Sequence, residues 1–69
     1  MTEYRASIYA WQDLLPEHIQ NIKDFMLRNR IQHGIDHDYE YLWMRITDEL
    51  WFMFSMVNPA VAKIFRRQP

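Results

Sequence analysis

The sequence contains no cysteine, only one glycine and three prolines. Without cysteine the chain forms no disulfide and offers no thiolate metal ligand. With one glycine it has no glycine-rich loop of the kind that binds phosphate groups. The lack of cysteine fits a reducing compartment, and we expect a cytoplasmic protein. Because small domains without such covalent or metal links usually rely on a partner chain for stability, we also expect a partner.

Long apolar runs are missing as well. The longest, residues 50–54, has five residues, whereas a membrane-spanning helix needs about 18. No secretory signal is apparent near the N-terminus, so no membrane association is expected. The net charge of −1 also lacks the positive excess that is typical of nucleic-acid-binding proteins.

Apolar residues are abundant in what remains: they make up 49% of the chain, and aromatic residues alone make up 16%. This composition favours a folded chain over a disordered one. A length of 69 residues indicates one domain over residues 1–69, with a core that is small for its length.

Helical spacing of apolar residues is the strongest pattern, and it predicts an all-α domain. The expected helices span residues 16–32 and 38–57, which form a hairpin around Gly34, with shorter flanking helices at 2–14 and 59–67. Pro16 suits a first helical position, and Pro59 would end one helix and open the next. Residues 2–14 also show the alternation of a strand, but a lone strand would have no partner in an all-α chain.

The expected helix at 38–57 is apolar on nearly every side. One stripe, spaced alternately by four and three residues, would pack on the rest of the chain: Tyr39, Trp43, Ile46, Leu50, Met53 and Val57. A second apolar set points elsewhere, and a helix that is apolar all round is normally buried all round. We therefore predict that a second chain covers this set, which comprises Tyr41, Met44, Trp51, Phe52 and Phe54.

The predicted function is accordingly that of a small protein-binding module, an inhibitor or an accessory protein, acting as a homodimer and contacting another protein. The format also fits small accessory proteins of mobile elements, although this is an association only. In one alternative, Trp51 and Phe52 fold onto the terminal segments of the same chain and leave a monomer.

The other function considered is a small nucleic-acid-binding regulator. Its contacts would be the basic residues near the ends of the expected helices, which are Arg28, Arg30, Lys63, Arg66 and Arg67. This alternative is weaker because the helix expected after Gly34 begins with acidic residues, which phosphates repel.

Enzymatic, metal and cofactor sites are not expected. Residues 33–40 gather two histidines and three carboxylates, but Gly34 interrupts the spacing that would bring them together on a helix. The acids are better explained as caps of the following helix. His18, Ser7 and Ser55 are isolated, so no nucleophile with a local signature is present.

Overall fold

The computed structural model describes the whole chain, residues 1–69, as four strands and four helices. In chain order the elements are β1 (Thr2–Ser7), α1 (Ile8–Gln12), α2 (Pro16–Arg28), β2 (Gln32–Asp36), β3 (Tyr41–Ile46), α3 (Asp48–Val57), α4 (Pro59–Ala62) and β4 (Phe65–Arg67). The protein is therefore a small α+β domain, and the prediction of an all-α helical hairpin is wrong.

The four strands form one antiparallel sheet with the order β2-β3-β1-β4. Helices α1 and α2 connect β1 to β2, and α3 and α4 connect β3 to β4. Because the hairpin strand β3 lies between β1 and β2, the connectivity is that of the β-α-β-β-α-β, or ferredoxin-like, arrangement.

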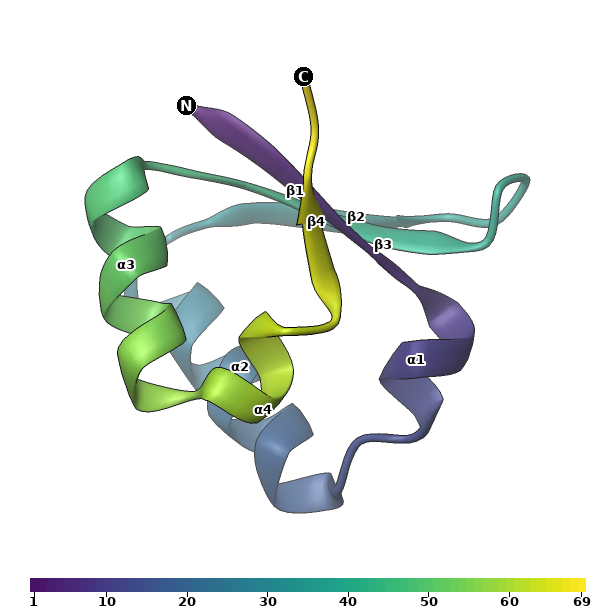
Figure 1. Cartoon of the computed structure of the whole chain (residues 1–69), viewed down its shortest axis with the longest axis horizontal. Coiled ribbons are helices and arrows are strands. Elements are labelled where there is room, and N and C mark those ends of the chain that lie inside the picture. Colours follow the sequence, from purple (N-terminus) through teal and green to yellow (C-terminus); the bar gives the residue numbers. More distant parts are fainter.

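All the helices lie on one side of the sheet, and the opposite face is uncovered (Figure 1). Side chains alternate along the strands in agreement with this layering. Tyr4 and Ala6 of β1 and Met44 and Ile46 of β3 are buried towards the helices. We call the uncovered side, which carries the intervening residues, the open sheet face.

The core lies between the sheet and α2, α3 and α4. Its largest fully buried side chains are Phe54, Ile22, Met44, Ile46 and Val61. Aromatic rings link the two layers, since Trp51 of α3 stacks on Tyr4 of β1 with ring centroids 3.8 Å apart. Burying one such ring contributes roughly 1.5–3 kcal/mol, so a few rings supply much of the stability of this chain.

The helix expected at residues 38–57 is in fact a strand followed by a shorter helix. In β3, buried Met44 and Ile46 alternate with Arg45, which is the two-residue period of a strand. Thr47 marks the change, because its hydroxyl accepts a hydrogen bond from the Leu50 amide at 3.2 Å and caps α3. The expected six-residue stripe therefore does not lie on one helix face.

The N-terminal segment is also a strand, followed by one short helix. A strand had been rejected here because no partner strand was expected. The structure supplies two partners for β1, which are β3 and β4, and both lie inside segments that had been predicted to be helical. Ser7 then starts α1 by accepting a hydrogen bond from the Tyr9 amide at 3.1 Å. The C-terminal segment likewise begins as a helix at Pro59 but ends as β4.

The helix beginning at Pro16 is confirmed, although it ends at Arg28, before residue 32. Arg30, with a φ of 53°, takes the left-handed conformation in the turn after α2, and the expected helical hairpin around Gly34 does not form. Gly34 instead lies in β2 under the Trp43 side chain. A Cβ atom at position 34 would come within 2.9 Å of that indole ring, so the close packing requires glycine.

Candidate functional site

The most unusual surface of the molecule is the exposed side of α3. Phe52, Met53, Met56 and Val57 are exposed to 64%, 56%, 68% and 76%. At about 100° per residue these four side chains fall on one continuous side of the helix, which we call the α3 outer face. Scattered exposed apolar residues are ordinary on a monomer, whereas a contiguous patch of this kind is a candidate contact surface.

A shallow groove between α2 and α3 borders the α3 outer face. Its apolar lining includes Met53 and Val57, and its polar lining includes Asp24 and Arg28. Asp24 and Arg28 are four residues apart on α2 but form no ion pair, and Asp24 instead accepts a hydrogen bond from the side-chain amide of Gln20 at 2.8 Å. Both ion pairs of the molecule involve Glu3. Arg28 therefore lies unpaired beside the C-terminal end of α3.

The N-terminal end of α3 carries the opposite charge. Asp48 and Glu49 lie in its first turn, where the helix dipole favours anions. Asp48 accepts a hydrogen bond from the Thr2 hydroxyl at 3.3 Å, whereas Glu49 has no partner. The α3 outer face thus has a carboxylate at one end and a guanidinium beside the other.

The five residues predicted to contact a partner do not form one surface. Met44 and Phe54 are each 1% exposed and belong to the core of their own chain. Trp51 is half-buried against Tyr4, and Tyr41 lies on the open sheet face beneath Arg5. Of the five, only Phe52 is an exposed side chain on α3.

Sequence reasoning missed Met53, Met56 and Val57 as members of this surface. Met53 and Val57 had been assigned to the inward stripe of a helix that was taken to start at residue 38. The available signal was Thr47 followed by two acids, which is a typical helix start. If the helix begins at Thr47, the residues of β3 no longer belong to it, and they cannot define which of its sides faces the core.

The basic residues considered for nucleic acid are also separated. Arg66 and Arg67 belong to β4 at one edge of the sheet, and Lys63 ends α4, whereas Arg28 and Arg30 precede β2 at the opposite edge. Lys63 lines a pocket with His18 near the start of α2, and Arg28 lies in its last turn. No single nucleic-acid surface includes all five.

A second polar cluster occupies the open sheet face, and Glu3 of β1 lies at its centre. One Glu3 oxygen accepts a hydrogen bond from Arg5 Nε at 2.6 Å, and the other accepts one from Arg45 Nε at 3.2 Å. The pKa of Glu3 lies below its ordinary value, mainly because its carboxylate accepts the hydrogen bond from Arg5. Burial opposes this lowering of the pKa, and the hydrogen bond from Arg45 adds to it. Glu3 therefore remains ionised at neutral pH and ties β1 to β3.

Both arginines also lie over aromatic rings of β3. The Arg5 guanidinium carbon is 4.5 Å from the Tyr41 ring centroid, and that of Arg45 is 4.8 Å from the Trp43 ring centroid. Such cation–π pairs hold the guanidinium groups against the sheet. The open sheet face is consequently an ordered array of rings and cations.

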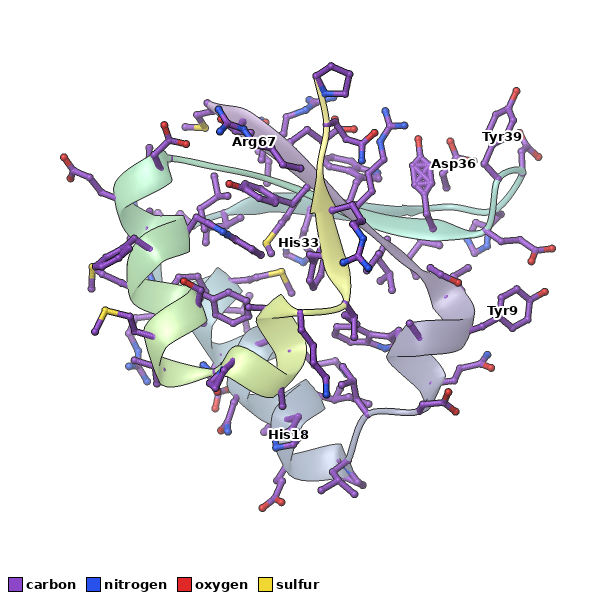
Figure 2. The ribbon with its side chains drawn as sticks, in the orientation of Figure 1. Tyr9, His18, His33, Asp36, Tyr39 and Arg67 are labelled. Atoms are coloured by element: carbon purple, nitrogen blue, oxygen red, sulfur yellow. The ribbon has the colours of Figure 1, made fainter.

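A groove continues from this face towards the β2–β3 turn. Its lining includes Tyr9, Tyr39, Tyr41, Arg5 and Arg66. Figure 2 shows Tyr9 and Tyr39 projecting from the same side of the molecule. Hydrogen bonding to Glu40 raises the pKa of Tyr9, so its hydroxyl is protonated at neutral pH.

The histidines and carboxylates of residues 33–40 do not converge. The His33 ring nitrogen Nδ1 pairs with the Ile31 carbonyl at 2.8 Å, and no group of three potential ligands is placed to hold a metal ion. Asp36 accepts hydrogen bonds from the Asp38 and Tyr39 amides, at 3.0 and 3.1 Å. Asp36 thus shapes a turn between two strands, which corrects its expected role as a helix cap. His18 lies at the far end of the helical layer (Figure 2).

No protein-family model, no curated protein and no solved structure matches this chain. None of the helices combines the length and apolar character needed to cross a bilayer.

Proposed function

We propose that the protein is a small non-enzymatic protein-binding module that forms a homodimer through the α3 outer face. The observation that carries this proposal is the contiguous exposure of Phe52, Met53, Met56 and Val57 on one helix. Apolar area removed from water stabilises a contact by about 25 cal/mol per Å². Aromatic and methionine side chains are also the types enriched in interfaces between proteins.

A second copy of the chain is the partner that this surface fits best. In an antiparallel pairing of two α3 helices, Glu49 of one copy lies near the C-terminal end of α3 in the other. Arg28 lines the groove at that end, together with Val57 and Asn58. Each carboxylate would therefore meet a guanidinium, twice in one symmetric contact. The antiparallel arrangement also places opposite ends of the two helix dipoles side by side.

The expected affinity is modest. A helix of ten residues is only about 15 Å long, so two of them bury less than the roughly 800 Å² per partner of a standard interface. We expect a dissociation constant on the order of micromolar, which corresponds to about 8 kcal/mol of binding free energy. Such a dimer exchanges subunits readily and is open to regulation by concentration.

Replacing Phe52 or Met56 by serine is expected to weaken the dimer at least tenfold, because each change removes an apolar anchor from the contact. Sedimentation equilibrium across a range of protein concentrations measures this effect directly. Tyr39→Ser is the matched control, since Tyr39 is 82% exposed on a turn away from α3. It should leave the association constant unchanged.

Two results would contradict the proposal. One is a wild-type chain that remains a monomer at millimolar concentration. The other is a dimer that Phe52→Ser and Met56→Ser leave intact while their circular dichroism is native. The first result would leave the α3 outer face to a partner of another sequence, which the same two variants would then fail to bind.

A further inference from the structure

We propose that the open sheet face is a binding site for single-stranded nucleic acid. This site lies on the opposite layer of the molecule from the α3 outer face and is independent of the dimer. It is formed by Arg5, Tyr41, Trp43, Arg45 and Arg66, which come from β1, β3 and β4. Its aromatic rings can stack on bases, and its guanidinium groups can bind phosphates, whatever the nucleotide sequence.

The arginines have hydrogen-bonding capacity to spare. Arg5 and Arg45 each donate a hydrogen bond to Glu3 through Nε, and their terminal nitrogens form no hydrogen bond. The terminal nitrogens form the fork that binds phosphate oxygens in pairs. The terminal nitrogens of both guanidinium groups are therefore available to bind phosphate oxygens.

Arg66 extends the cationic surface to the β4 edge. Its position pairs with Arg5 in the β1–β4 ladder, so both side chains start from the open sheet face, and both line one groove. Arg66 Nη1 donates to the Lys63 and Phe65 carbonyls, at 2.9 and 3.3 Å, and its other two nitrogens form no hydrogen bond. The strands place three arginines and two carboxylates, those of Glu3 and Asp36, on this face, and the carboxylate of Glu40 lines the adjoining groove. The three guanidinium groups supply the phosphate-binding charge of this face, although the whole chain has a net charge of −1.

The two rings of β3 supply stacking surfaces. Tyr41 and Trp43 are two residues apart on one strand, which places them about 6.7 Å apart. That separation is roughly twice the 3.4 Å rise per nucleotide of a duplex. Only an unstacked single strand can place successive bases on both rings. In this binding mode a base replaces the guanidinium group that lies over each ring. The displaced guanidinium group then contacts the neighbouring phosphate.

A duplex does not fit the same surface. The major groove is about 12 Å wide and admits a helix or a two-stranded ribbon, whereas this face is four strands wide. A peptide strand would have to pair along a sheet edge, because the face itself offers side chains and no free backbone groups. The combination of rings and cations therefore favours single-stranded nucleic acid over a duplex or a peptide.

Fluorescence anisotropy with fluorescein-labelled single-stranded oligonucleotides of twelve thymidines or twelve uridines tests this site. Binding is expected at low salt, and with about three phosphate contacts the slope of log K against log salt should be near −2. Tyr41→Ala should weaken binding roughly tenfold through the loss of one stacking surface, whereas Tyr41→Phe should retain it. Arg66→Ala should weaken binding and reduce the magnitude of the slope by about 0.7.

Gly34→Ala provides a second test that removes neither a ring nor a charge. Its new Cβ would lie 2.9 Å from the Trp43 indole and force that ring to move. Affinity should therefore fall while the salt slope stays constant. Wild-type protein that fails to bind either oligonucleotide at low salt would overturn the proposal. So would binding that natively folded Tyr41→Ala, Arg66→Ala and Gly34→Ala all leave unchanged, or equal affinity for a twelve-base-pair duplex.

Discussion

Met44→Lys is expected to leave the chain unfolded at 25 °C, whereas Arg45→Ala, one position further on, should leave it folded. Met44 is 1% exposed in the core, and its register partner in β1 is Tyr4. A lysine ammonium there would lose its hydration without gaining a partner, which costs more than about 4 kcal/mol. A domain of this length has little more than that to lose.

Arg45 is the matched control because it lies on the opposite face of the same strand. It is 51% exposed and pairs with Glu3 across the sheet. Removing an exposed ion pair of this kind costs up to about 1 kcal/mol. Far-UV circular dichroism and urea titration of the two variants measure the difference. A helix over residues 38–57 would instead tolerate lysine at position 44, so a folded Met44→Lys protein would contradict β3.

Trp51→Ala is expected to destabilise the fold by about 3–5 kcal/mol, the usual cost of deleting a large core ring. The Trp51 ring lies 3.8 Å from that of Tyr4, 5.7 Å from Phe54 and 6.2 Å from Phe65, measured between centroids. It thus joins α3 to both β1 and β4. Aromatic pairs in such stacked and edge-on geometries contribute beyond their buried area.

Phe52→Ala should cost less than about 0.5 kcal/mol in the monomer, because Phe52 is 64% exposed. Urea unfolding at micromolar or lower concentration, where the monomer prevails, compares the two variants. Two neighbouring rings on one helix are therefore expected to differ several-fold in their effect on the free energy of unfolding. Equal effects, or a larger one for Phe52→Ala, would show that α3 is rotated relative to this structure.

The helix beginning at Pro16 could be predicted from sequence because its signals are local. Proline at the first position, Glu17 in the first turn and apolar residues at helical spacing all act within one segment. Ile22 and Met26, four residues apart on its apolar face, are buried. No residue distant in sequence was needed to define this element.

The sheet depends on pairings between distant segments, and these could not be predicted from local spacing. Thr2 pairs with Ile46, and Ala6 with both Leu42 and Phe65. Each strand looks ambiguous alone, since residues such as Tyr4, Ala6 and Ile8 fit two periods. The strand alternative for the N-terminus was correct but was rejected for want of a partner, because the partners had themselves been interpreted as helical.

The candidate surfaces could likewise be predicted only where local signals define them. An excess of apolar side chains was evident from composition, and Phe52 was correctly placed on the outside. The division of the remaining residues between core and surface required the bend at Thr47. The array of Arg5, Tyr41, Trp43 and Arg45 was not visible at all, because it arises only when β1 lies beside β3.

The antiparallel α3 contact is tested most directly by charge reversal at its two ends. Sedimentation equilibrium at low ionic strength, where screening is weak, would compare wild type with Glu49→Arg, Arg28→Glu and the double variant. Each single change places like charges together twice in the dimer, and we expect roughly tenfold weaker association from each. The double variant restores opposite charges and should recover association close to that of wild type. A double variant that dimerises no better than either single variant, or single variants that dimerise as well as wild type, would contradict the proposed contact.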